Sequence, residues 1–188
     1  NVKRVAIIGA GLLGGSFGLA IRGLFPNAEV IGVSRSQSSR DAAVQSGAVT
    51  SAIADADEAC IGSDLVVVST PVDTIAPIVI RAADRCHDAA LIIDLGSTKA
   101  TIVRTVERNE RASRFFVGTH PIAGSEKTGA QHACRDLFSS RTVIVTPGER
   151  TPKTLVNRVN ALWKSMDARV VQMSPEGHDV ALASVSHV

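Results

Sequence analysis

The sequence predicts an α/β domain with a doubly wound, mostly parallel sheet. Short runs rich in β-branched residues alternate with segments of helical periodicity along the 188 residues. The run at residues 65–68, LVVV, is apolar throughout, as expected of a strand that is buried on both faces of a parallel sheet. A glycine-rich turn joins the first predicted strand to the first predicted helix. These three features together indicate the fold class.

The elements follow from apolar periodicity and from breaks at Gly and Pro. Pro26 and Asn27 end the first helix, Gly47 ends the second, and Pro71 ends the fourth strand. We expect strands at residues 4–9, 29–34, 49–53, 64–70, 90–95, 116–119, 142–146 and 169–172. We expect helices at residues 12–23, 38–46, 74–86, 98–111 and 153–165, a loop at 120–129, and a helical pattern from 174 onward.

The composition is that of a soluble globular protein, with 45% hydrophobic residues, 20% charged residues and a net charge of +2. The apolar runs are too short to span a bilayer, and no basic stripe is interleaved with aromatics, so neither a membrane nor nucleic acid is expected as a partner. Cys60, Cys86 and Cys134 form no metal-binding cluster, and they are expected to be buried thiols of a reducing compartment. We therefore expect a cytoplasmic protein. Because the chain starts at Asn1, this expectation leaves open that a targeting leader has been removed.

Residues 9–14, GAGLLG, form a GxGxxG motif directly after a strand and at the start of a helix. Gly9 permits the tight turn, Gly11 leaves the backbone open to a pyrophosphate, and Gly14 lets the helix pack on the strand. The first-turn amides, at Leu12 and Leu13, then face the phosphates. Because a second strand follows at the expected distance, the motif predicts a dinucleotide site in a Rossmann-type fold. The alternative is a structural turn that binds no ligand.

The end of the second strand favours NADP over NAD. NAD-specific sites carry Asp or Glu there, whereas this chain has Ser34, Arg35 and Ser36. The Arg35 guanidinium can pair with a 2′-phosphate or stack on adenine; as an alternative it is a solvated turn residue. Three residues at the end of the fourth strand are expected beside the cofactor's ribose or phosphate, or form a plain strand end: Ser69, Thr70 and Pro71.

Two further strand ends carry polar groups, at residues 94–99 and 118–126, and both are expected to face the nicotinamide crevice. Ser97 and His120 would meet there, where they could bind and deprotonate a substrate hydroxyl as hydride leaves the neighbouring carbon. Histidine suits this role because its ordinary pKa is near neutral. Periodicity alone leaves open that His120 is a structural histidine.

Residues 118–129, GTHPIAGSEKTG, closely resemble the GxHPIAGxExSG segment of the prephenate and arogenate dehydrogenases of tyrosine biosynthesis. Residues 94–99, DLGSTK, are similar to that family's D-x-G-S-x-K strand end. Residues 173–179, MSPEGHD, and 186–188, SHV, resemble its M-x-P-x-x-H-D and S-H-L segments, with Val188 in place of leucine. In order and spacing the resemblance runs over essentially the whole chain.

The resemblance implies oxidative decarboxylation of prephenate or arogenate, with NADP or NAD as hydride acceptor, to 4-hydroxyphenylpyruvate or tyrosine. It implies that His120 acts as the base toward the ring hydroxyl and that Ser97 positions the same hydroxyl. It implies a substrate-side histidine at His187 and places Ser125 and Glu126 near the substrate mouth. Both substrates stay open, and the turn at the second strand tilts the choice toward arogenate.

Other polar residues of these segments have a structural interpretation. We expect Lys99, His178 and Asp179 to form a local ion pair or a helix cap. His87 and His132 match no motif and are expected on the surface.

We expect residues 1–172 to form the dinucleotide-binding Rossmann domain and residues 173–188 to form the first helix of a truncated helical dimerisation domain, so that the complete protein is a homodimer. The helical pattern reaches the last residue without a stop signal, which indicates a fragment of a longer protein. Two other functions stay open. One is a hydroxyacid dehydrogenase of the 6-phosphogluconate-like class, and the other is a non-catalytic NADP-binding module.

Overall fold

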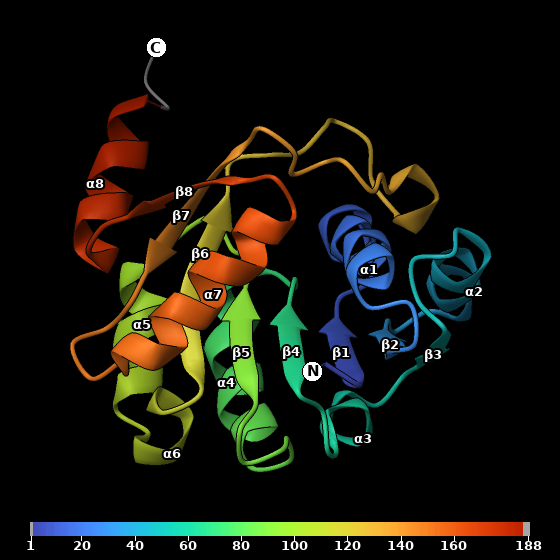
Figure 1. The fold of residues 1–188 in the computed structure, drawn as a ribbon, viewed down its shortest axis with the longest axis horizontal. Helices are drawn as coiled ribbons and strands as arrows, with labels where there is room; N and C mark the ends of the chain where they lie inside the picture. The colour runs from blue at the N-terminus through green and yellow to red at the C-terminus, as the bar shows by residue number, and fades with distance from the viewer. Residues whose placement is uncertain (1, 186–188) are drawn as a thin grey trace.

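The computed structural model describes residues 2–185 and confirms the α/β class (Figure 1). Its strands are β1 (Arg4–Ile8), β2 (Glu29–Val33), β3 (Ser51–Ile53), β4 (Leu65–Val68), β5 (Leu91–Asp94), β6 (Phe116–Pro121), β7 (Thr142–Thr146) and β8 (Arg169–Gln172). Its helices are α1 (Leu12–Leu24), α2 (Gln37–Gln45), α3 (Ala56–Cys60), α4 (Val72–Ala83), α5 (Ala100–Glu107), α6 (Glu110–Ser113), the 3₁₀ turn η1 (Ala130–His132), α7 (Lys153–Ser165) and α8 (Pro175–Val185).

In the described part of the chain, eight strands form one sheet in the order β3-β2-β1-β4-β5-β6-β7-β8. Every neighbouring pair is parallel except β6 and β7, which are antiparallel. The chain reaches one edge at β3 and then crosses back to place β4 on the other side of β1. The strand order therefore reverses between β1 and β4, and the crevice at their carboxyl ends is where sheets of this kind bind ligands.

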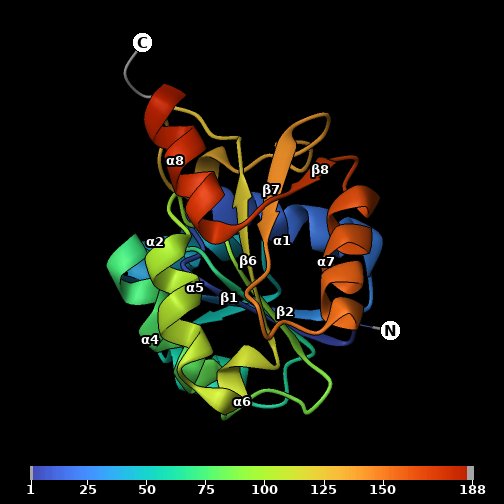
Figure 2. The same ribbon diagram turned by 90° about the vertical axis from the view of Figure 1, so that its left-hand side faces the viewer.

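Helices cover both faces of the sheet because the buried strands are apolar on both sides. Val5 and Ile7 of β1 belong to the core under α1 and α7, where Trp163 is fully buried. Ala6 and Ile8 belong to the core under α3, α4, α5 and α6. Figure 2 shows α7 on one side of the sheet and α4, α5 and α6 on the other.

Three expectations about the elements were wrong. The helix expected over residues 98–111 is broken into α5 and α6, because the Asn109 side chain accepts a hydrogen bond from the backbone of Ala112 and starts a new helix. The short helix α3 was not expected, and Asp55 caps its start. The strand expected at 116–119 continues to Pro121 in register with β7, so His120 lies on a strand rather than in the following loop.

All three cysteine thiols were expected to be buried, and for one of them this was wrong. Cys60 and Cys86 are buried, and burial raises the pKa of the Cys60 thiol to about 12. Cys134 is exposed in the turn after η1, where its backbone amide donates to the Ser16 hydroxyl of α1 at 2.9 Å.

Helix α8 follows β8 and lies beside α5 at the carboxyl edge of the sheet (Figures 1 and 2). Arg104 of α5 pairs with Glu176 of α8, with 3.2 Å between nitrogen and oxygen. The side chain of Val180 is 69% exposed on this helix. Among the helices of residues 2–185, none has the length and apolar character that crossing a membrane requires.

Candidate active site

The turn between β1 and α1 has a backbone that only glycine permits. Gly9 has a φ of +93°, and a Cβ there would lie 2.3 Å from the carbonyl oxygen of Ser69. A Cβ on Gly14 would lie 2.2 Å from the carbonyl oxygen of Gly9. At Gly11, by contrast, a Cβ would meet no atom within 4 Å, and no side chain caps the start of α1. The first amides of α1 are therefore accessible to an anion.

A cavity of about 1090 Å³ opens at the carboxyl ends of β1, β2 and β4. Its walls are the glycine turn, the turn after β2, the end of β4, part of α4 and part of the loop after β6. Among the residues expected to bind cofactor, its lining includes Gly9, Gly11, Ser34, Arg35, Ser36, Ser69, Thr70 and Pro71. Leu12 and Leu13 lie in the first turn of α1 outside this lining, and Gly14 is buried beneath the turn.

One wall of the cavity comes from a segment to which the sequence motifs assign no role. The loop after β6 folds back over α1 and α2, where Ala130 is buried. It brings Thr128, Gly129 and Gln131 to the cavity, and none of these three residues was expected at the site. No local pattern predicts this return, because it depends on contacts between η1 and the helices α1 and α2, which lie more than eighty residues earlier in the chain.

The charged groups that line this cavity are both cations. Arg35 is exposed, and its guanidinium makes no hydrogen bond or ion pair with any residue that the structure describes. Arg40 steadies the same turn by donating to the carbonyl oxygens of Ser34 and Arg35, each at 2.8 Å. Arg81, in contrast, pairs with Asp57 at 3.0 Å. The cavity therefore suits an anionic ligand, with Arg35 as its uncommitted cation.

Asp94 and Lys99 form a fully buried ion pair where β5 ends, which confirms the expected ion pair at Lys99. Burial lowers the pKa of the Lys99 ammonium, and the Asp94 carboxylate opposes that shift. Lys99 also donates to the carbonyl oxygen of Thr119 at 2.9 Å, and Asp94 accepts from the amides of Thr119 and Gly96. Asp94 was expected to face the crevice, but it is buried here and fastens the β5 end to β6.

His120 projects from β6 at the same edge and is partly buried. Its Nδ1 lies 2.8 Å from Nε2 of His178, which has no exposed surface, and Nδ1 of His178 lies 2.7 Å from Oδ1 of Asp179. Burial, followed by the neighbouring His178 and Lys99, lowers the pKa of His120 to about 4. His120 is therefore held as a neutral imidazole.

The remaining expected site residues that the structure describes are exposed and make few side-chain hydrogen bonds. Ser97 is exposed in the loop between β5 and α5 and makes no side-chain hydrogen bond with the described residues. Ser125 accepts from the Lys127 amide at 3.0 Å, and both it and Glu126 are exposed in the loop after β6. His187 lies outside the described residues.

A model of the prephenate dehydrogenase nucleotide-binding domain matches residues 17–172. The chain belongs to the prephenate dehydrogenase family. It is 35% identical to the prephenate dehydrogenase of Bacillus subtilis strain 168, over 97% of this chain and 50% of that protein. It therefore spans half the length of that relative.

Two solved structures of the family superpose closely on this chain. One is prephenate dehydrogenase from Aquifex aeolicus in complex with hydroxyphenyl propionate and NAD⁺, with a TM-score of 0.88, 30% identity, and coverage of 100% of this chain and 69% of that one. The other is Synechocystis arogenate dehydrogenase, with a TM-score of 0.83, 27% identity, and coverage of 98% and 64%.

Within the segment that resembles the family's M-x-P-x-x-H-D motif, the structure separates two kinds of residue. Asp179 accepts from the amides of Lys99 and Ala100 at 2.8 and 2.9 Å, which confirms the expected helix cap. His178 was also expected to be an ion-pair or cap residue, and its contact with His120, 58 positions earlier, was missed. The two histidines meet only because α8 packs beside β7 and α5.

The lowered pKa of His120 leads to a testable result for this chain. An ordinary histidine titrates near 6.5, whereas His120 is expected to titrate near pH 4 because burial disfavours its cation. Between these values the unfolded chain binds the proton more tightly, so this residue's contribution to stability is lost as pH falls from 6.5 toward 4. An NMR titration, with the resonance assigned by His120→Asn, measures this; a midpoint near 6.5 would refute it.

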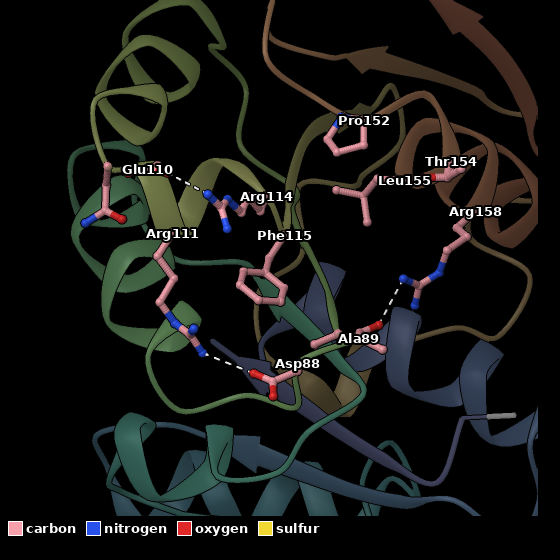
Figure 3. Close-up of a pocket in the computed structure, with 12 residues that line it drawn as sticks. Asp88, Ala89, Glu110, Arg111, Arg114, Phe115, Pro152, Thr154, Leu155 and Arg158 are labelled. Atoms are coloured by element: carbon pink, nitrogen blue, oxygen red, sulfur yellow. Dashed lines mark hydrogen bonds and ion pairs between the residues drawn. The ribbon is translucent and has the colours of Figure 1, made fainter.

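A second cavity, of about 780 Å³, lies at the opposite edge of the sheet, where β5 and β6 begin (Figure 3). Three arginines line it, and each already has a partner: Arg111 pairs with Asp88, Arg114 with Glu110, and Arg158 donates to the carbonyl oxygen of Ala89. This cavity is remote from His120 and takes no part in the candidate site.

Proposed function

We propose that the complete protein containing this chain catalyses the NAD(P)-dependent oxidative decarboxylation of prephenate or arogenate. The observation that carries this proposal is a neutral, partly buried histidine at the carboxyl end of β6, at the same edge of the sheet as the cavity at the glycine turn. Membership in the prephenate dehydrogenase family supports the reaction class. The products are 4-hydroxyphenylpyruvate from prephenate and tyrosine from arogenate.

The residues that hold the cofactor in this proposal fit a dinucleotide. Gly9 and Gly11 leave the backbone bare at the phosphate position, and the amides at Leu12 and Leu13 begin the helix that faces it. Five further residues at strand ends would contact the ribose and adenosine phosphate: Ser34, Ser36, Ser69, Thr70 and Pro71. When bound, the nicotinamide supplies a hydride acceptor for the carbon that bears the substrate hydroxyl.

The chain's own residues then handle the hydroxyl proton. His120 accepts that proton while Ser97 hydrogen-bonds the same oxygen and holds it in place. Loss of the ring carboxylate as carbon dioxide makes the product ring aromatic, which drives the step forward. We assign His187 to the substrate side and Ser125 and Glu126 to the substrate mouth, on the resemblance of their segments to the family.

We also propose that NADP is preferred over NAD, because Arg35 is the uncommitted cation of the cavity. Arg35→Ala is expected to weaken NADP⁺ binding roughly 10- to 100-fold, which corresponds to the loss of one charge-assisted hydrogen bond to the 2′-phosphate. It is expected to leave NAD⁺ binding nearly unchanged, because NAD⁺ lacks that phosphate. Isothermal titration calorimetry with each cofactor measures both effects. Arg85→Ala is the matched control, because Arg85 is an exposed arginine that does not line the cavity. Equal losses for both cofactors at Arg35 would refute the preference.

We further propose that residues 1–172 are the cofactor domain and that residues 173–188 begin a helical dimerisation domain in a cytoplasmic homodimer. The half-length coverage of the Bacillus subtilis relative and the exposed Val180 on α8 support this division. Sedimentation of the complete protein tests the assembly, and a monomer at all concentrations would contradict it.

The reaction itself is tested by following formation of reduced nicotinamide in the complete protein with prephenate and with arogenate. We expect turnover with at least one of them, and product analysis identifies which. A protein that binds cofactor and turns over neither substrate would overturn the proposed function.

A further inference from the structure

Three side chains form a continuous hydrogen-bonded chain from the start of α8 to the candidate base. Asp179 contacts Nδ1 of His178 at 2.7 Å, and Nε2 of His178 contacts Nδ1 of His120 at 2.8 Å. The His178 side chain has no exposed surface, so its two ring nitrogens have no access to water in place of these partners. The Nε2 atom of His120 is left as the ring nitrogen not used within this chain of contacts.

The direction of each hydrogen bond follows from the charge at one end. Burial raises the pKa of the Asp179 carboxyl, but hydrogen bonds from Ala100, His178 and Lys99 outweigh it and lower the pKa overall. Asp179 is therefore ionised and can only accept, so Nδ1 of His178 must donate. With one proton on the His178 ring, that proton is on Nδ1, so Nε2 of His178 accepts and Nδ1 of His120 donates.

We propose that His178 and Asp179 are positioning residues that fix His120 in the tautomer whose bare Nε2 faces the substrate hydroxyl. This inference rests on the proposed function, and it adds the reason why Nε2 of His120 is free to accept the proton. When the substrate O–H bond breaks and the Nε2–H bond forms, His120 becomes an imidazolium whose Nδ1–H already points at His178. The charge of Asp179 then faces the new cation across the ring of His178.

The same carboxylate also anchors the backbone close to Ser97, the other candidate side chain of the site. Asp179 accepts from the amides of Lys99 and Ala100, which start α5 directly after the loop that carries Ser97. One residue of α8 thus orients both the imidazole ring of His120 and the backbone next to Ser97. The position of α8 against α5 is in this way linked to the geometry of the site.

Two substitutions of one residue separate the positioning role from packing. In His178→Gln, the side-chain oxygen can reach the place of Nε2 and still accept from His120. In His178→Asn, the shorter side chain reaches only the place of Nδ1, toward Asp179. We expect kcat of the complete protein to fall by about 10²-fold in H178N and by less than about tenfold in H178Q, with KM and cofactor Kd within about threefold of wild type. His132→Asn, at an exposed histidine, is the matched control.

A second readout does not depend on turnover. Nitrogen-15 NMR of histidine-labelled protein distinguishes the two tautomers, and His120→Asn assigns the signal. We expect wild type and H178Q to carry the His120 proton on Nδ1, and H178N to show a mixture. If H178N does not fold, Asp179→Asn replaces it, because asparagine still offers a carbonyl oxygen to the α5 amides.

The outcomes are distinct. A wild-type His120 protonated on Nε2, or an H178N variant with wild-type tautomer and kcat, would overturn the positioning role. Equal loss of kcat in H178Q and H178N would also overturn it, because the loss would then arise from altered packing rather than from the hydrogen bond to His120. A wild-type protein that turns over neither substrate would refute the proposed function, and the tautomer measurement alone would then decide whether His178 fixes the His120 ring.

Discussion

Replacing His120 with asparagine in the complete protein is expected to lower kcat by about 10³-fold, within the range that a positioned general base contributes. Asparagine can accept a hydrogen bond but cannot take the hydroxyl proton at neutral pH. The affinity for NADP⁺ or NAD⁺ is expected to stay within about twofold, because His120 does not line the cavity at the glycine turn. Steady-state kinetics and calorimetry measure the two quantities separately.

This substitution also distinguishes among the functions that remained open from the sequence. A non-catalytic NADP-binding module would show no change in any property of the His120→Asn variant. An unchanged kcat in a protein that does turn over prephenate or arogenate would remove His120 from the mechanism. His132→Asn serves again as the control for loss of an exposed histidine.

Replacing Asp94 with asparagine is expected to lower the free energy of unfolding by about 3–5 kcal/mol, because it leaves the Lys99 ammonium buried without its counter-charge. Denaturant titration of the chain measures the loss. Glu110→Gln is the control, since it breaks an exposed pair with Arg114 and should cost less than about 1 kcal/mol.

A second variant tests the cause of that loss. Adding Lys99→Met to Asp94→Asn removes the unpaired charge, so the double variant is expected to be more stable than Asp94→Asn alone. If the loss of stability in the double variant equals the sum of the losses in the two single variants, the cost arises from packing rather than from the uncompensated ammonium. The ion pair would then not be what fastens β5 to β6.

Local sequence signals predicted the sheet and the glycine turn because both depend on short-range chemistry. Gly9 and Gly14 are required by backbone contacts within one strand-turn-helix unit, and alternation along β1 assigns its side chains to two cores. The break between α5 and α6 was missed because one side chain, Asn109, decides it. Hydrophobic periodicity is judged over several turns of helix, so it does not detect a break that depends on one capping side chain.

The parts of the site that were missed depend on contacts between distant segments. Gln131 reaches the cavity at the glycine turn because η1 packs on α1 and α2, and His178 reaches His120 because α8 packs beside α5. Motif resemblance pointed to the segment around His178 but not to its partner. Spacing along the chain does not contain that information.

The measurement that tests the central claim most directly is the ratio of carbon dioxide released to nicotinamide reduced. The complete protein would be given NADP⁺ or NAD⁺ with prephenate or arogenate labelled in the ring carboxylate. Coupled oxidation and decarboxylation predicts one carbon dioxide for each reduced cofactor, and loss of both in His120→Asn. Reduced cofactor without carbon dioxide would indicate a simple alcohol oxidation, as in a hydroxyacid dehydrogenase, and would contradict the account.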